Sequence, residues 1–171
     1  MRNIYANTNY NFKKQTLNLF FLLVFFTLNS SYAQYCSVGT TSSSYWIDNF
    51  TTTGGFTNIN NTSTYSTSGY GDFTALSINQ TAGSTFNFNI TTSSGTHGIN
   101  IWIDWNQDFD FNDTGEDVYS SGSYVSSTSG TISIPGGTSN GTYRMRVVAN
   151  WSNTDPSACG STTYTEAEDY T

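Results

Sequence analysis

The sequence predicts an all-β fold, a two-sheet antiparallel β-sandwich of immunoglobulin-like or jelly-roll-like type. Beyond residue 33 there is no helical periodicity, whereas apolar and polar residues alternate with period two over short segments. Stretches of glycine, serine and threonine separate these segments. Aromatic residues make up 16% of the chain and charged residues only 10%, a composition that supplies buried area and argues against disorder.

An N-terminal signal peptide over 1–33 is expected before this domain. Basic residues precede an apolar stretch at 17–28, and the triplet Ser-Tyr-Ala at 31–33 fits the small-x-small rule of signal peptidase. The apolar stretch is too short for a transmembrane helix. We therefore expect secretion, no membrane insertion after signal cleavage, and one domain over 34–171.

The segments expected as strands are, in chain order, 45–51, 56–59, 73–78, 85–91, 98–105, 131–134 and 142–149. Serine, threonine and glycine stretches near 61–71, 92–98 and 120–130 are expected as loops. Two apolar triplets each share one face of a strand and are expected in the core, namely Phe86, Phe88, Ile90 and Ile99, Ile101, Ile103.

In the strand at 142–149, alternation turns Tyr143, Met145 and Val147 toward the core. Arg144 and Arg146 then lie together on the opposite face. They either face solvent or offset nearby carboxylates.

The cysteines are Cys36 and Cys159, and both follow the signal peptide. In an oxidising compartment a disulfide between them is expected, and it would contribute roughly 4 to 5 kcal/mol in the chain-entropy model. The alternative is two buried free thiols. Residues 34–171 carry two arginines against all twelve acids, a formal charge of −10, so nucleic acid and anionic membranes are poor partners and we expect no nucleic-acid binding.

Six of the twelve acids fall between Asp104 and Asp117. Side-chain oxygens recur at alternate positions, as a hard cation with six to eight oxygen ligands requires. We therefore predict a Ca²⁺ site with the ligands Asp104, Asn106, Asp108, Asp110, Asn112 and Glu116. The alternative is a solvated acidic loop. In an EF-hand loop the sixth position is glycine, and here that position is Phe109.

No catalytic residues are predicted. His97 is the only histidine, and no Gly-x-Ser-x-Gly elbow accompanies it. The triplet Asp113-Thr114-Gly115 matches aspartic proteases but lacks a second copy, and that chemistry needs two carboxylates sharing a proton.

Two segments resemble the GEVED domain of secreted bacterial proteins. They are Ile-Trp-Ile-Asp-Trp-Asn-Gln-Asp at 101–108, followed by Gly115-Glu116, and Thr-Glu-Ala-Glu-Asp-Tyr at 165–170. The resemblance covers about 35–171 and implies a β-sandwich accessory module of multidomain surface proteins of Bacteroidota type, with other domains of the same polypeptide as partners. It implies no enzymatic activity. Thr165 and Ala167 depart from the glycine and valine of the signature, and Phe109 departs from a usual glycine.

Glu166, Glu168 and Asp169 form a second acidic group in this signature. On a strand, Glu166, Glu168 and Tyr170 would share one face and Ala167 and Asp169 the other. The group either completes the cation site, pairs with Arg144 and Arg146, or forms a charged sheet edge that discourages aggregation.

Together these features predict a calcium-stabilised adhesion, binding or spacer module at the cell surface, not an enzyme. One alternative is an accessory domain of a secreted hydrolase, a peptidase or glycosidase, whose catalytic domain lies elsewhere. Another is a carbohydrate-binding module, because Trp46, Trp102, Trp105 and Trp151 can stack on sugar rings. The partner would then be a surface glycan, or else a protein. The full product is expected to extend beyond Thr171.

Overall fold

The computed structural model describes residues 34–40 and 42–171, and the predicted signal peptide at 1–33 lies outside these residues. Residues Gln34–Thr171 form one compact unit. The strands are β1 (Val38–Gly39), β2 (Ile47–Thr53), β3 (Asn60–Thr62), β4 (Tyr70–Asp72), β5 (Thr85–Thr92), β6 (Gly98–Ile103), β7 (Asp117–Ser120), β8 (Ser127–Ser133), β9 (Met145–Asn150), β10 (Gly160–Ser161) and β11 (Thr165–Tyr170), with a 3₁₀ turn η1 (Thr67–Gly69) before β4.

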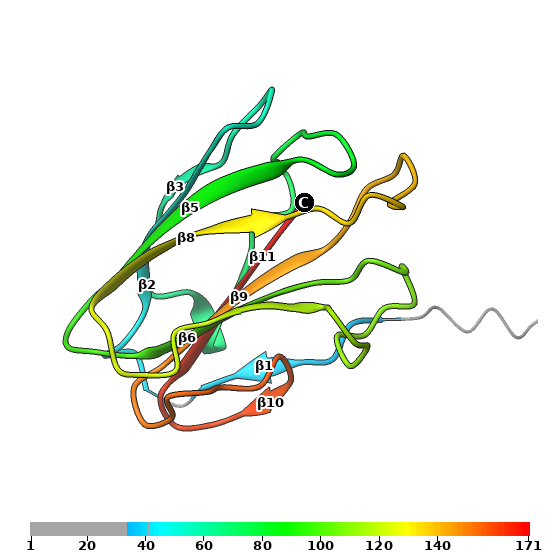
Figure 1. The fold of residues 1–171 in the computed structure, drawn as a ribbon. Helices are drawn as coiled ribbons and strands as arrows, with labels where there is room; N and C mark the ends of the chain where they lie inside the picture. The colour runs from blue at the N-terminus through cyan, green and yellow to red at the C-terminus, as the bar shows by residue number, and fades with distance from the viewer. Residues whose placement is uncertain (1–33, 41) are drawn as a thin grey trace, which may run out of the picture. The chain divides into compact units, whose positions relative to one another are not determined.

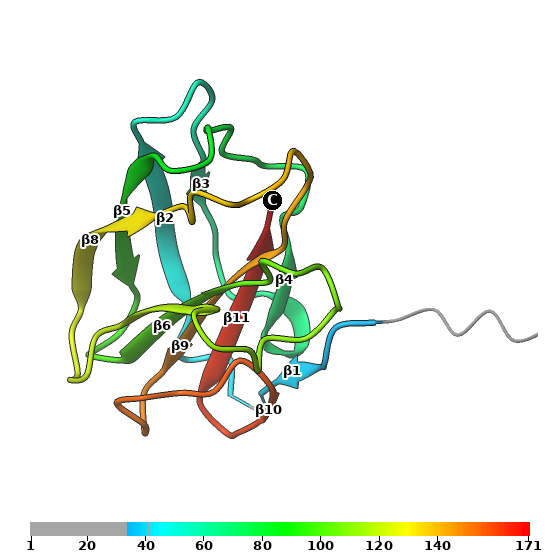
Figure 2. The same cartoon turned by 45° about the vertical axis from the view of Figure 1, so that its right-hand side comes forward.

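The strands form a β-sandwich of two main sheets, as predicted. One sheet has the order β3-β2-β5-β8 and the other β4-β11-β9-β6-β7. Figures 1 and 2 show the two sheets facing each other, with β1 and β10 beside the five-stranded sheet. Pairing within the main sheets is antiparallel except between β4 and β11, and β1 pairs with β10 in parallel.

The predicted strands at 85–91 and 98–105 correspond to β5 and β6, and their apolar triplets are buried between the sheets. The alternation is clean in β5, where buried and exposed residues succeed one another. β6 is buried on both faces, because its outer side is covered as well. Helices long and apolar enough to cross a membrane do not occur among the described residues.

The strands expected at 56–59 and 73–78 are wrong. Phe56 is 80% exposed, and the segment makes a single bridge, between Thr57 and Asn79. Asp72 accepts hydrogen bonds from the amide and the hydroxyl of Thr74, which turns the chain out of β4. Apolar side chains at 73–78 therefore pack on the core from a turn. Conversely, β3, β4 and the first residues of β8 lie in stretches expected as loops.

A second apolar cluster lies on the outer face of the five-stranded sheet. Its buried members are Val38, Trp102, Phe111, Val148, Ala158 and Ala167. The segments around β1 and β10 cover it, and they are joined by the disulfide between Cys36 and Cys159, whose Cα atoms lie 5.5 Å apart. The predicted disulfide is thus confirmed, and it ties down a third layer outside the sandwich.

Candidate functional site

The acidic segment forms the loop between β6 and β7. The amides of Asp108, Asp110 and Asn112 each donate to the side-chain oxygen two residues earlier, at 2.8 to 3.1 Å. These are successive Asx turns, in which a short polar side chain imitates a backbone turn. The alternating oxygen side chains therefore shape the loop.

The carboxylates that come together are those of Asp108, Asp110 and Asp113, each with one oxygen within 4.8 Å of the others. Asn106 Nδ2 donates to Asp108 and to Asp113, at 3.0 and 2.5 Å. Asp113 was absent from the predicted ligands because it falls outside the alternating pattern. Only the turn that brings the chain back toward Glu116 places it beside Asp108.

Asp104 and Glu116 are buried at the two ends of the loop. Asp104 accepts hydrogen bonds from the amides of Gln107 and Phe109, at 2.6 and 3.1 Å, and from the hydroxyl of Tyr35 at 2.5 Å. Glu116 accepts from the amides of Trp105 and Asp113 at 3.1 and 3.3 Å. Both carboxylates hold the loop closed, while Asn112 is exposed at its tip.

The backbone of Phe109 lies in the left-handed region, with φ 73°. A side chain costs about 1 to 2 kcal/mol in that conformation, which glycine adopts freely. The ring lies 44% exposed against Tyr35, with centroids 5.5 Å apart. Phe109 therefore has a backbone conformation that favours glycine, the residue usual at the sixth position of an EF-hand loop.

We predict that Phe109→Gly is more stable than Phe109→Ala by about 1 kcal/mol, because both variants lose the ring but only glycine relieves the backbone. Urea unfolding of the two variants measures the difference. Equal midpoints would show that the loop relaxes around any residue at this position.

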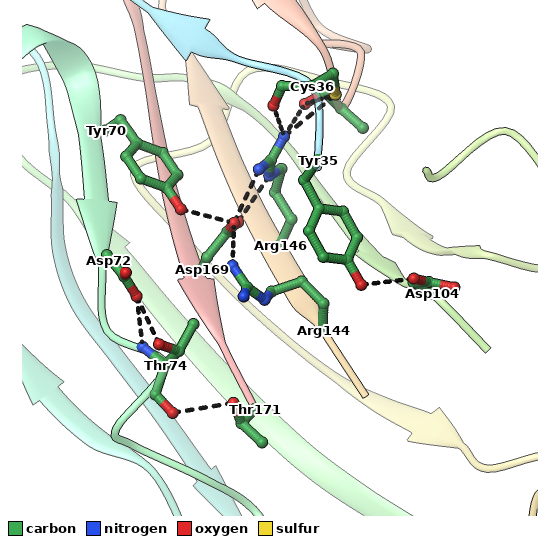
Figure 3. A network of polar contacts seen from close by, with 11 residues as sticks. Tyr35, Cys36, Tyr70, Asp72, Thr74, Asp104, Arg144, Arg146, Asp169 and Thr171 are labelled. Atoms are coloured by element: carbon green, nitrogen blue, oxygen red, sulfur yellow. Dashed lines mark hydrogen bonds and ion pairs between the residues drawn. The ribbon is translucent and has the colours of Figure 1, made fainter. Parts of the chain in front are cut away.

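The signature strand β11 carries a buried ion-pair network (Figure 3). Arg146, only 1% exposed, donates through Nε and Nη2 to the two oxygens of Asp169, at 2.7 and 2.8 Å. Its Nη1 donates to the carbonyls of Cys36 and Ala158, at 2.9 and 3.0 Å. Arg144 donates to Asp169 at 3.0 Å, and so does the hydroxyl of Tyr70 at 2.9 Å.

The network reaches the acidic loop through aromatic rings. The Arg144 guanidinium lies 4.8 Å from the ring centre of Tyr35, whose hydroxyl donates to Asp104. The Arg146 guanidinium lies 5.0 Å from the ring centre of Phe111, a loop residue. Burial, followed by the bond to Asp104, raises the pKa of Tyr35 well above its ordinary value. Asp169 and the loop therefore share one packed layer.

The other two acids of the signature point between the sheets. Glu166 accepts from the amides of Ile47 and Ser66 at 2.5 and 2.6 Å, which joins β11 to the opposite sheet. Glu168 is fully buried beside Ser63 and Tyr170. β11 lies between β4 and β9, so the sheet-edge interpretation of this acidic group is wrong.

The tryptophans have different environments. Trp102 is 5% exposed in the outer cluster and offers no platform for a ligand. Trp151 is 41% exposed and stacks on Tyr45, with ring centroids 5.2 Å apart. Trp105 is partly buried and contacts Tyr143, with centroids 5.8 Å apart.

Comparison with protein-family models matches residues 98–171 to the GEVED domain. The matched region begins at β6 and includes the acidic loop, both arginines and the signature strand. Comparisons with curated proteins and with solved structures give no match. The match supports the GEVED-type interpretation of the residues that build the candidate site.

Proposed function

We propose that residues 34–171 form a secreted accessory module, an adhesion, binding or spacer domain, whose acidic loop binds a calcium ion. The GEVED match and the all-β fold support an accessory module. The observation that carries the calcium proposal is the group formed by Asp108, Asp110 and Asp113.

These carboxylates repel one another at such short distances, by about 1 kcal/mol per pair in water and more near the protein surface. Oxygen-rich, anionic sites of this kind suit Ca²⁺. Asp108, Asp110 and Asp113 would hold the ion, whose charge would offset part of the negative charge of the loop. Asp104 and Glu116 would keep the loop in shape through the hydrogen bonds that they accept from backbone amides.

A binding or spacing role is also favoured over hydrolysis by the environment of His97. The ring is 1% exposed, and within residues 34–40 and 42–171 neither nitrogen has a hydrogen-bond partner. A catalytic triad needs a histidine bonded to both a nucleophile and an orienting carboxylate. His97 packs instead against the ring of Tyr45, with centroids 5.7 Å apart.

Several millimolar Ca²⁺ should raise the melting temperature relative to EDTA, because an ion that binds only the folded state stabilises it. At ten times a dissociation constant on the order of 0.1 to 1 mM, the gain is about 1.4 kcal/mol. Thermal melts in EDTA, Mg²⁺ and Ca²⁺ measure it.

The double substitution Asp108→Asn with Asp113→Asn should abolish this response. Asp48→Asn, an exposed acid on β2, is the matched control and should retain it. Identical wild-type melts in EDTA and in calcium would leave a solvated acidic loop and remove the metal from the proposal.

A further inference from the structure

A cavity of about 310 Å³ opens between the two sheets at one end of the sandwich. Its walls come from the end of β6, the loop between β8 and β9, and the segment before β5, and Thr171 lies at its margin. In Figure 1 this is the end marked by the C-terminus. The volume lies at the lower end of the range of small-molecule sites.

The interior of this cleft combines an apolar floor with an aromatic wall. Phe86, Ile103 and Met145 of the main core form the floor. Trp105 and Tyr143 line the wall, their rings tilted by 55°. The hydroxyl of Tyr143 donates to the carbonyl of Ser139 at 2.8 Å, and the amide of Trp105 donates to Glu116. Both aromatic residues are therefore anchored before any ligand arrives.

The rim is polar and uncharged. All the side chains lining the cleft are neutral, in a domain whose formal charge is −10. Asn79 and Asn140 lie exposed at the rim, and within the described residues their side-chain amides make no hydrogen bond. An anionic ligand would find no basic side chain here, and a cationic one no acidic side chain, so the lining side chains favour a neutral ligand.

Free amides and partly buried aromatic faces complement one chemical class in particular. A sugar ring has an apolar C–H face that stacks on Trp or Tyr, and hydroxyls at its edge that pair with an amide donor and acceptor. A lipid chain would form no hydrogen bond with the amides of the rim, which would then contribute nothing to its binding.

We infer that this cleft binds a neutral saccharide, with Trp105 and Tyr143 as the stacking surface and Asn79 and Asn140 as hydrogen-bonding groups. The inference rests on the proposed role as an accessory module and gives it a ligand class. It also distinguishes three of the four tryptophans, since Trp105 is in the cleft, Trp102 is buried and Trp151 lies elsewhere on the surface.

The test is binding of the full, disulfide-bonded chain to a panel of neutral oligosaccharides, comprising gluco-, xylo-, manno- and galacto-hexaoses, with an oligogalacturonate as the anionic probe. At least one neutral probe should bind and the anionic probe should not. Trp105→Ala and Tyr143→Ala should each weaken binding roughly tenfold, the loss expected for one aromatic contact. Asn140→Ala, at an exposed position, should weaken binding while leaving the melting temperature unchanged.

Trp151→Ala is the matched control, because it removes an exposed tryptophan outside the cleft, and its binding should equal wild type. No binding to any neutral probe, or binding that Trp151→Ala removes and Asn140→Ala does not, would overturn the inference. Titrations in calcium and in EDTA separate it from the metal proposal. Binding that persists in EDTA with no calcium effect on melting would support the cleft and contradict the metal site alone.

Discussion

Asp169→Asn is expected to lower the free energy of unfolding by about 3 to 5 kcal/mol, since it leaves the buried charge of Arg146 without its counterion. The pair is enclosed by β9, β11 and the segments tied by the disulfide, so water cannot replace the lost carboxylate. Urea unfolding of both proteins measures the effect.

Asp72→Asn is the matched control for this prediction. Asp72 is the residue opposite Asp169 in the parallel pairing of β4 with β11, but it is exposed and bonds only to Thr74. Its replacement should cost no more than about 1 kcal/mol. Similar losses in the two variants would contradict a special role for the buried pair.

Arg146→Lys should lie between wild type and Asp169→Asn. Lysine keeps the charge but has a single side-chain nitrogen. That nitrogen cannot bind both oxygens of Asp169 and also the carbonyls of Cys36 and Ala158.

Tyr35 and Phe111 connect Arg144 and Arg146 to the acidic loop. We therefore also expect calcium to raise the melting temperature of Asp169→Asn less than that of wild type.

Glu168→Gln is expected to stabilise the protein by about 3 kcal/mol at pH 8 and to change little at pH 4.5. Burial raises the pKa of Glu168 to about 7, from an ordinary value near 4.5. Between pH 4.5 and about pH 7, Glu168 keeps its proton in the folded state and loses it in the unfolded state. The free energy of unfolding therefore falls as the pH rises through this range. Glutamine imitates the protonated acid at every pH and removes this loss.

Hydrogen-bond geometry agrees with a protonated Glu168. Ser63 Oγ donates to the carbonyl of Ile47 at 2.8 Å and lies 2.6 Å from Glu168 Oε1. One hydroxyl hydrogen cannot serve both acceptors, and a proton on Glu168 supplies the second bond. Tyr170 donates to the other oxygen, Oε2, at 2.6 Å.

His97 has the opposite effect on the dependence of stability on pH. Burial lowers its pKa to about 4 from an ordinary 6.5, so acid favours the unfolded state and stability rises with pH between these values. In wild type the effects of Glu168 and His97 on stability oppose each other over most of this pH range. In Glu168→Gln only the effect of His97 remains, so stability should rise with pH. Denaturation midpoints from pH 4 to 8 measure both, and a constant difference between the two proteins would contradict the assignment to Glu168.

Local patterns were sufficient for much of this fold. Alternation in 85–91 and 98–105 predicted β5, β6 and their core residues, because successive side chains of a strand point to opposite faces of its sheet. The same rule placed Arg146 of β9, and Arg144 directly before it, on the face opposite Met145 and Val147. Two cysteines in a chain that we expect to be exported predicted the disulfide.

Other features could not be read from the sequence. Six consecutive buried residues of β11 include three acids, which looks like a surface pattern until Asp169 meets Arg146 and Glu166 meets the amides of the opposite sheet. Similarly, the sequence does not distinguish Asp104, Asp108 and Glu116 as oxygen ligands for a cation. In the structure, Asp104 and Glu116 accept hydrogen bonds from backbone amides, whereas the carboxylate of Asp113 lies close to that of Asp108.

The division has a physical reason. Strand periodicity and the pairing of two cysteines depend on residue type and spacing, which the sequence displays by itself. The fate of a carboxylate depends on which donors and charges reach it from distant segments, and on how much water remains around it. Only the packing of β11 beneath Cys36 and Ala158, and of the acidic loop against Tyr35, decides which carboxylates stabilise the fold and which do not.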